Sequence, residues 1–480
     1  MSLLEADSEG IALQVTQSFN NLEATELSIK VSEILRILPG RREVYAATLQ
    51  AEGRSVVAKR FLEHPKQSRD WRREWGNLLQ LAALNLSAPT PLCVAEEVDS
   101  TAVWVIMDRI QGAGLVVDGF EFGDRDERHE LARQLACLVD AAHRAGVRQG
   151  DQHVNNWAWD GCRLFLLDAG SVEFSRHTLK ERLRLQDLAG ICVTLAPAAE
   201  RLFREAIRTQ YLIGEELLKG RILYELDEAI VALQAERTRR YFKKSRRTCT
   251  EFVQSETKEY RSIYLQKADP ELVEAFLKDP EVLMAEGERL KSGNTCTVQG
   301  FSRGGRKYVL KRYNKQPLVD RLRKVFSNSR ALKSWSSSWI LEMAFIPTGR
   351  AVAVYEDIRE CLPGLRYLLM ERIEGQLLPE YIRACGADIS RIDMVGDAFA
   401  QIWESLGRLR AVHGDLKATN LIVGEDGRLY LFDLDSFRFA LKPSAFARGR
   451  DKDLRRFMQN WAEQPELIEL FESKLCKLGE

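Results

Sequence analysis

Stretches in which apolar and polar residues alternate open each half of the chain, and longer amphipathic stretches follow them. In the first half the alternation predicts strands at Glu33–Leu38, Glu43–Gln50 and Ser55–Phe61, separated by turns at Pro39–Gly40 and Glu52–Gly53. Because strands joined by short turns pair with one another, this region predicts a small antiparallel sheet.

Helical periodicity follows the predicted sheet in both halves. The first half continues with helices at Arg69–Leu84 and Arg128–Ala145, with a strand at Val103–Met107 between them. The second half repeats this order, with strands at Thr295–Phe301, Lys307–Tyr313 and Tyr367–Met370 and helices at Ala331–Ala344 and Arg391–Arg410.

Direct comparison of the two halves supports an internal repeat. The run from Met107 to Gly112 (MDRIQG) matches the run from Met370 to Gly375 (MERIEG), and VAKRF ending at Phe61 matches VLKRY ending at Tyr313. Matches at corresponding places in the same order indicate one architecture present twice in tandem.

The length of 480 residues allows two sizeable cores. We expect a lead at residues 1–28, either disordered or a short helix packed on the first domain. A first domain at 29–255, closed by helix Arg221–Arg240, a linker at 256–284 and a second domain at 285–480 are expected to follow. The expected class is α+β.

Composition excludes some functions. The 70 basic and 70 acidic residues cancel, which argues against a nucleic-acid partner. The nine cysteines form no regular framework, as expected of reduced thiols in a cytosolic protein. The chain shows neither a basic leader followed by an apolar core nor an apolar run long enough to cross a bilayer, so we expect a cytoplasmic protein.

Two loops carry the strongest chemical signal. The second half reads HGDLKATN at His413–Asn420 and then LFDLD at Leu431–Asp435, and the first half reads QGDQHVNN at Gln149–Asn156 and then LLDAG at Leu166–Gly170. Phosphoryl transfer needs a carboxylate to orient the attacking hydroxyl, together with an amide oxygen and a second carboxylate for Mg²⁺. Both halves supply all three.

We assign the orienting carboxylate to Asp151 and Asp415, although an aspartate at such a place can also cap a helix. The metal ligands are then Asn156 with Asp168, and Asn420 with Asp433, since oxygen donors suit a hard cation. Asp435 is either a further ligand or a structural hydrogen-bond acceptor.

Two residues after each orienting aspartate stand Lys417 and His153. A cationic or hydrogen-bonding group there can steady the γ-phosphate as charge moves. For His153, the alternative is a packed histidine without a role in the chemistry.

Lys59 and Lys311 lie in predicted strands, where an ammonium group can pair with the α- and β-phosphates of a nucleotide. A surface lysine on an edge strand is the alternative. Glu74, on the following helix, is placed to orient Lys59. The aligned position in the second half is Ser334, and Glu342 lies about 80° further around the helix, a poor position for a substitute.

Gly40 and Gly293 each offer one glycine at the turn where a phosphate loop would lie. A lone glycine is weak evidence, and only its place before each lysine gives it meaning.

Seven of the eleven residues in Arg237–Arg247 are basic, and five basic residues occur in Arg321–Lys333. Such a run is either a solvated helix face or a contact with anionic lipid headgroups or a phosphorylated saccharide.

At these motifs the chain resembles the lipopolysaccharide kinase superfamily, which comprises the bacterial heptose and Kdo kinases and their InaA-like relatives. The resemblance covers nearly the whole chain, once per half. It implies two tandem protein-kinase-like domains, each with a small antiparallel N-lobe and a mainly helical C-lobe. It also implies ATP as donor, Mg²⁺ as metal and a sugar hydroxyl of the lipopolysaccharide inner core as acceptor at the cytoplasmic face of the inner membrane.

Two functions of different class follow. In one, the protein is an ATP-dependent kinase of a core sugar. In the other, one domain is a pseudokinase scaffold that organises core assembly. The kinase loops are also compatible with another small molecule or a protein as substrate. Gln149, where the second half has His413, is the main departure in the first loop.

Overall fold

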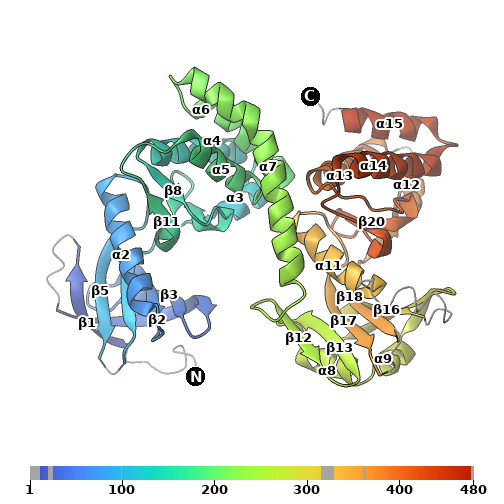
Figure 1. The fold of residues 1–480 in the computed structure, drawn as a ribbon, viewed down its shortest axis with the longest axis horizontal. Coiled ribbons are helices and arrows are strands. Elements are labelled where there is room, and N and C mark those ends of the chain that lie inside the picture. The colour runs from blue at the N-terminus through green and yellow to red at the C-terminus, as the bar shows by residue number, and fades with distance from the viewer. Residues whose placement is uncertain are drawn as a thin grey trace. The chain divides into compact units, whose positions relative to one another are not determined.

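The computed structural model describes residues 11–19, 25–98, 100–314, 329–359, 364–386 and 388–476. The chain divides into two compact units, Met1–Ile230 and Val231–Glu480, and helix α7 (Glu216–Lys244) runs across the division. Each unit combines antiparallel sheets with helices, so the chain is a mixed α and β protein, in agreement with the predicted α+β class (Figure 1).

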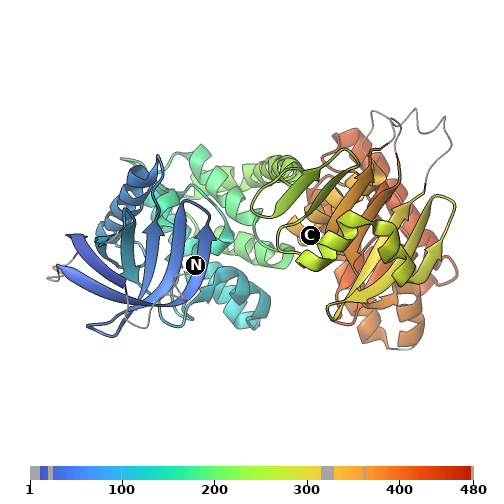
Figure 2. The same ribbon diagram turned by 90° about the horizontal axis from the view of Figure 1, so that it is seen from below.

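A closed six-stranded barrel forms the first part of the first unit, and its curved strands are visible in Figure 2. Its apolar interior includes Ile29, Tyr45 and Trp104, all buried. The strands, in the order in which they pair, are β1 (Ile11–Ser18), β2 (Glu26–Leu38), β3 (Arg42–Leu49), β4 (Arg54–Phe61), β6 (Val103–Asp108) and β5 (Pro91–Glu97).

The described part of residues 1–28 forms strands, so neither predicted form, a disordered lead or a short packed helix, is correct there. Leu13 and Leu27 are buried in the barrel, and β1 pairs with both β2 and β5. The alternation in this segment is short and its exposed positions are polar, so its apolar face was too sparse to recognise.

Helix α2 (Gln67–Ala83) lies between β4 and β5 in the chain and buries Trp71, Trp75 and Leu78 on one face. The remaining elements of this unit are short strands among helices: β7 (Gly114–Leu115), α3 (Val116–Phe122), α4 (Arg125–Arg144), β8 (Val147–Gln149), β9 (Trp157–Trp159), β10 (Leu164–Leu166), β11 (Val172–Phe174), α5 (Glu181–Cys192) and α6 (Pro197–Gln210). Asp124 begins α4 with a capping box that includes Glu127, which explains why this helix starts before the predicted Arg128.

A seven-stranded antiparallel sheet opens the second unit. In order of pairing its strands are β12 (Phe252–Glu256), β13 (Tyr260–Leu265), β17 (Ala351–Asp357), β18 (Arg366–Glu371), β16 (Arg306–Tyr313), β15 (Cys296–Arg303) and β14 (Glu288–Ser292). Helix α11 (Arg330–Met343) packs against one apolar cluster of this sheet through Trp335 and Trp339.

The predicted linker at 256–284 is wrong, because this segment is part of the second unit. It contains β13, which pairs with β17, and helices α8 (Pro270–Lys278) and α9 (Pro280–Glu286). Leu272 and Phe276 of α8 are fully buried in a second apolar cluster. The mixed charges of the segment lie on its exposed positions and hide this apolar face from composition alone.

The rest of the second unit again consists of short strands among helices. These elements are β19 (Gly375–Leu377), α12 (Leu378–Cys385), α13 (Ile389–Arg408), β20 (Leu421–Gly424), β21 (Leu429–Leu431), α14 (Pro443–Met458) and α15 (Pro465–Cys476). Their core includes Phe399, Phe457 and Phe471, and the rings of Phe399 and Phe457 are stacked with centroids 4.0 Å apart.

Candidate functional site

Lys59 and Glu74 form a buried ion pair in the first unit. Lys59 comes from β4 and Glu74 from α2, and the distance from Nζ to Oε1 is 2.5 Å. The side chains are 7% and 1% exposed, so neither charge is solvated by bulk water. An ion pair this deeply buried is costly unless further groups satisfy it, and Arg42 supplies a second cation 3.5 Å from Glu74.

Asp168 lies beside the same lysine, with 3.8 Å between Lys59 Nζ and Asp168 Oδ1. Burial alone would raise the pKa of Asp168, but the charges of Lys59 and Arg42 more than offset it and hold the pKa below its usual value. The hydroxyl of Ser171 donates to Asp168 Oδ2 at 3.0 Å. The carboxylate is therefore ionised at neutral pH, as a cation ligand must be.

Two hydrogen bonds join helix α2 to the segment that follows Asp168. Asn77 Nδ2 donates to the carbonyl oxygens of Ala169 and Val172, at 2.7 and 2.9 Å. Gly170 passes so close to Glu74 that a Cβ on it would lie 2.5 Å from Oε2. The glycine of the LLDAG run is thus needed for close approach to the ion pair.

The loop that carries Asp151 is tied to the Asp168 segment through Asn156. The Asn156 amide donates to the Asp151 carbonyl oxygen at 2.7 Å, and the Asn156 carbonyl accepts from Leu167 N at 2.8 Å. Asp151 itself is exposed. His153 Nδ1 accepts from Asn155 N at 3.2 Å, so His153 caps the short turn that positions Asn156.

Gln149 is buried beneath this loop. Its Nε2 donates to the Asp168 carbonyl at 3.3 Å, whereas its Oε1 is buried without a hydrogen-bond partner. At the corresponding place in the second unit, His413 Nε2 lies 2.9 Å from the Phe432 carbonyl. Gln149 and His413 therefore both contact the backbone of the segment that carries Asp168 or Asp433, although the two side chains differ.

In the second unit Lys311 lies between two aspartates. Its Nζ is 2.7 Å from Asp433 Oδ1 and 2.9 Å from Asp435 Oδ1. Burial alone would lower the pKa of Lys311, but the nearby carboxylates of Asp435 and Asp433 raise it above its usual value. The lysine is charged, and its partner comes from the metal loop and not from a helix.

Asp435 takes the place that Glu74 has in the first unit. Ser334 of α11, the residue aligned with Glu74, donates to Asp435 Oδ1 at 2.9 Å, and Tyr313 donates to the same oxygen at 2.7 Å. Arg330 binds the other oxygen at 2.5 Å. Glu342, in contrast, forms an ion pair with Arg350 at 3.2 Å, so the expectation that it is a poor substitute agrees with its position.

Of the two readings of Asp435, the hydrogen bonds favour the structural one. Burial alone would raise the pKa of Asp435, but Lys311 and Arg330 hold it below its usual value. The sequence does contain a signal for this role. Ser334 stands where the first unit has Glu74, and Asp435 follows Asp433 by two residues.

The loop that carries Asp415 is built like that of Asp151. Asn420 Nδ2 donates to the Asp415 carbonyl at 2.8 Å, and Phe432 N donates to the Asn420 carbonyl at 3.1 Å. Asp433 has φ 60° and ψ 61°, a left-handed conformation that costs a non-glycine residue about 1 kcal/mol or more. The Lys311 ion pair helps to hold it there.

Asp415 differs from Asp151 in its charged neighbours. Arg456 of α14 lies 2.6 Å from Asp415 Oδ1, and Lys417 lies 3.2 Å from Oδ2. The preceding Gly414 N donates to the buried carboxylate of Asp453, also on α14. Sequence reasoning found Lys417 but missed Arg456, because nothing in the local pattern links α14 to this loop.

The structure fixes the orientation of the asparagine amide in each predicted pair of metal ligands. In both units the asparagine NH₂ donates to a backbone carbonyl, so the amide oxygen is the atom of this side chain that could act as a cation ligand. Within the described residues no group of three or more His, Cys, Asp or Glu side chains is placed to hold a metal ion. A cation there would need phosphate or water oxygens as its other ligands.

Gly40 and Gly293 lie in the hairpin turns β2–β3 and β14–β15, each one hairpin before its lysine strand. Gly40 has φ +67°, and no atom lies within 4 Å of a Cβ built on it. Gly293 N donates to the Cys296 carbonyl at 3.0 Å. The two turns thus occupy equivalent places in the two units, and whether they contact phosphate stays a prediction.

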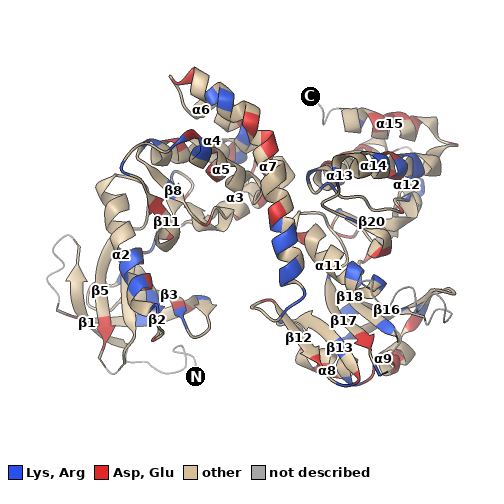
Figure 3. Ribbon diagram, viewed as in Figure 1, with Lys and Arg blue, Asp and Glu red and all other residues tan. Residues whose placement is uncertain are grey.

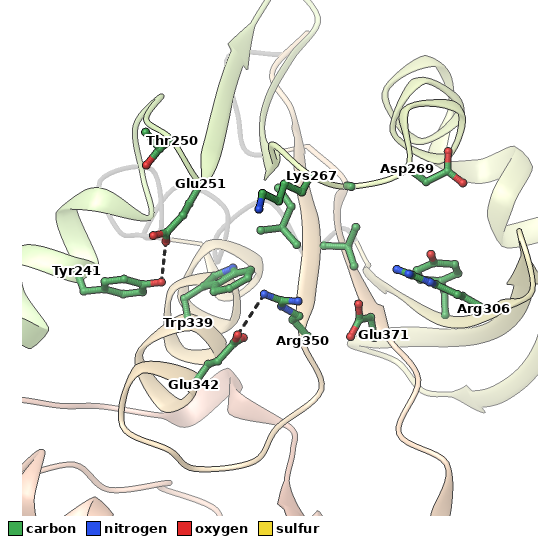
Figure 4. Close-up of a pocket in the computed structure, with 14 residues that line it drawn as sticks. Tyr241, Thr250, Glu251, Lys267, Asp269, Arg306, Trp339, Glu342, Arg350 and Glu371 are labelled. Carbon is green, nitrogen blue, oxygen red and sulfur yellow. Dashed lines mark hydrogen bonds and ion pairs between the residues drawn. The ribbon is translucent and has the colours of Figure 1, made fainter. Parts of the chain in front are cut away.

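A cavity of about 400 Å³ in the second unit lies apart from the Lys311 cluster (Figure 4). It is lined by aromatic and charged side chains from α7, α11 and the sheet, among them Tyr241, Trp339 and Glu371. Tyr241 donates to Glu251 at 2.9 Å, and burial raises the pKa of Glu342, an effect that Arg350 partly offsets. None of the predicted site residues lines this cavity.

The basic run Arg237–Arg247 covers the last turns of α7 and the residues after it, and Figure 3 shows its colour on that helix. Several of its members have contacts within the protein. Lys244 pairs with Glu251 and Arg240 with Glu236, and Arg239 donates to the Ala235 carbonyl at 3.2 Å. Arg246 donates to Ser336 at 2.9 Å and lies over the Phe242 ring. The other run begins at Arg321, and its residues 321–328 lie outside the described residues.

Comparison with protein-family models and with curated protein sequences found no match to this chain. In the part of the chain that the structure describes, no helix combines the length and the apolar character needed to cross a membrane.

Proposed function

We propose that the chain is a tandem pair of protein-kinase-like domains and acts as an ATP-dependent kinase on a sugar hydroxyl, heptose or Kdo, of the lipopolysaccharide inner core. The observation that carries the proposal is the cluster repeated in both units. A buried lysine lies beside the aspartate that follows the Asn-containing loop, at 3.8 Å in the first unit and 2.7 Å in the second.

In this mechanism Lys59 and Lys311 pair with the α- and β-phosphates of ATP, and Glu74 and Asp435 hold those lysines in place. Asp151 and Asp415 orient the acceptor hydroxyl and accept its proton as its oxygen bonds to the γ-phosphorus, while the bond from that phosphorus to the β,γ-bridging oxygen breaks and ADP leaves. Mg²⁺, when bound by Asn156 with Asp168 or Asn420 with Asp433, neutralises charge on the phosphates.

Lys417 and His153 stand beside the orienting aspartates. Lys417 supplies a positive charge near the place where the γ-phosphate would lie. His153 supports the loop through its turn contact with Asn155, which favours a supporting role over direct contact with phosphate.

The choice of acceptor rests on the sequence resemblance alone. Under this proposal the protein works in the cytoplasm, with the exposed part of Arg237–Arg247 as its contact with the anionic inner-membrane surface. Four of these residues, Arg239, Arg240, Lys243 and Arg247, are exposed, which such a contact requires.

A second candidate is that one unit is a pseudokinase scaffold. Two observations support this candidate. Gln149 stands where the second unit has His413, and Arg456 forms an ion pair with Asp415. Both units nevertheless retain the lysine, the orienting aspartate, the asparagine and the metal aspartate.

The proposal is tested by phosphate analysis of core oligosaccharide from a deletion strain complemented with Asp151→Ala or Asp415→Ala. Each substitution is expected to remove a distinct part of the phosphate, because an orienting aspartate acts only within its own cleft. Asp126→Ala, an exposed aspartate in the first turn of α4, is the control. Full phosphorylation with both Asp151 and Asp415 replaced contradicts the proposal; loss with only one of them assigns the other unit to the scaffold.

A further inference from the structure

Three basic residues form a stripe along α14. Arg448, Lys452 and Arg456 follow one another at intervals of four residues, so their side chains share one face of the helix. The stripe spans about 12 Å at 1.5 Å per residue. Arg448 and Lys452 are exposed, and among the described residues neither has a hydrogen-bond or ion-pair partner. Figure 3 shows the Lys and Arg positions of α14 in blue.

The stripe ends at the carboxylate that we assign to the acceptor hydroxyl. Arg456 Nη2 lies 2.6 Å from Asp415 Oδ1, and Lys417 adds a further cation 3.2 Å from the other oxygen. Two cations thus contact this carboxylate, and the other two residues of the stripe continue along α14 from Arg456. In the first unit, no described cation is within ion-pair distance of Asp151.

The other basic residues of α14 have structural partners. Arg450 lies 4.0 Å over the Trp403 ring and donates to the Trp403 carbonyl, and Arg455 pairs with Asp451. Basic residues in the last turn of a helix also favour the helix dipole, which accounts for Arg455 and in part for Arg456. Neither explanation covers Arg448 and Lys452, which lie before the last turn.

We propose that the Arg448–Lys452–Arg456 stripe binds phosphate or carboxylate groups of the acceptor of the second unit. This inference rests on the proposed function and narrows its substrate: the second unit takes an acceptor that is already anionic. An anionic group of the acceptor would pair with Arg456 in place of Asp415. Asp415 would then be free to accept the hydrogen bond of the acceptor hydroxyl. Since no cation among the described residues of the first unit pairs with Asp151, we expect that unit to take a different hydroxyl.

The test uses the full chain with Asp151→Ala, so that only the second unit transfers phosphate, and deacylated core oligosaccharide as acceptor. Arg448→Gln combined with Lys452→Gln is expected to raise KM about tenfold with kcat nearly unchanged, since two exposed charge contacts of ordinary strength together give about this factor. Arg455→Gln, which removes one charge from the same helix away from the stripe, is the control. An unchanged KM in the double variant overturns the inference.

Two further acceptors identify the anion. If the stripe binds phosphate, the double variant and its parent have the same KM for dephosphorylated oligosaccharide. If it binds carboxylate, the difference disappears with carboxyl-reduced oligosaccharide instead. A difference that persists with an acceptor lacking both groups overturns the inference.

Failure of the proposed function is seen separately, as absence of transfer by the unaltered protein. The stripe is then tested by calorimetric binding of inositol hexakisphosphate in the presence of a saturating non-hydrolysable ATP analogue. Weaker binding by the double variant than by Arg455→Gln supports an anion site, and equal binding overturns it.

Discussion

The carboxylate that partners a buried lysine comes from a helix in the first unit and from a loop in the second. Glu74 reaches Lys59 from α2, whereas Asp435 reaches Lys311 from the residues after Asp433 and is held by Ser334 of α11. In both units the result is a lysine with almost no exposure and a fixed position. Each buried lysine thus has a carboxylate partner, although Glu74 and Asp435 are not at corresponding positions in the two halves of the sequence.

Asp435→Asn is expected to destabilise the second unit by about 3 kcal/mol, because it leaves the buried charge of Lys311 with one partner fewer and removes the partner of Arg330. Nucleotide binding in that unit is expected to weaken as well. Urea unfolding and calorimetry measure the two effects. The control is Asp426→Asn, at an exposed aspartate near Arg428, where a change below about 1 kcal/mol is expected. Equal effects of the two substitutions contradict the assigned role of Asp435.

The same residue predicts a pH dependence. The pKa of Asp435 is below its ordinary value of 3.8 in the folded protein, so the unfolded state binds the proton more readily. Its contribution to the free energy of unfolding is therefore fully present above that value and is lost as the pH falls through the folded-state pKa. The difference between wild type and Asp435→Asn is expected to be constant from about pH 7 down to about pH 5 and to shrink below about pH 4. If the difference in the free energy of unfolding between wild type and Asp435→Asn grows as the pH falls, Lys311 and Arg330 do not stabilise the ionised carboxylate of Asp435.

At the scale of elements, α2 and the Asp168 segment act as one body in the first unit. Asn77 joins them through two carbonyl oxygens, and Gly170 allows the segment to approach Glu74. The Lys59–Glu74 pair and Asp168 are therefore held in one position relative to α2.

Gly170→Ala is expected to weaken Mg²⁺-ATP binding in the first unit at least tenfold, roughly 1.4 kcal/mol, because the added methyl group displaces Glu74 from Lys59. The matched control is Gly76→Ala on α2, where a Cβ meets no atom within 4 Å and alanine favours the helix by about 0.5 to 1 kcal/mol. Calorimetric titration in a Lys311→Ala background isolates this unit. Unchanged affinity in Gly170→Ala would mean that the Glu74 contact is not needed for binding.

Most helices and strands were predictable from periodicity, because their apolar faces are regular. Trp71, Trp75 and Leu78 mark α2, and the lysine strands appear in both halves. The segments at 1–28 and 256–284 were misread since their buried residues, such as Leu13 and Phe276, are few among polar neighbours. Only the pairing of β1 with β5 and of β13 with β17 shows what buries them.

The candidate site was predictable where residues lie close in sequence and hidden where they do not. The loops of Asp151 and Asp415 carry their own asparagine, and the structure places each metal aspartate beside its lysine. Arg456 reaches Asp415 from a distant helix, and Arg330 and Tyr313 reach Asp435 from other elements. Contacts of this kind depend on the tertiary fold and leave no local pattern.

At the scale of the whole molecule, the chain contains the same order of elements twice with different sheets around it. The first unit closes six strands into a barrel, whereas the second extends its sheet to seven strands covered by α8 and α9. In both, the lysine strand, the following helix and the two loops keep their order. The same order of elements around unlike sheets is what the proposed tandem arrangement requires.

The central claim is that each unit holds its own nucleotide cleft, and the stoichiometry of Mg²⁺-ATP binding by isothermal titration calorimetry tests it most directly. Two molecules are expected to bind per chain, with one remaining in Lys59→Ala and one in Lys311→Ala. The double substitution is expected to abolish binding, while Lys258→Ala, a lysine in the exposed β12–β13 turn, leaves both sites intact. No binding by the unaltered chain, or a stoichiometry that neither lysine substitution changes, would contradict the account.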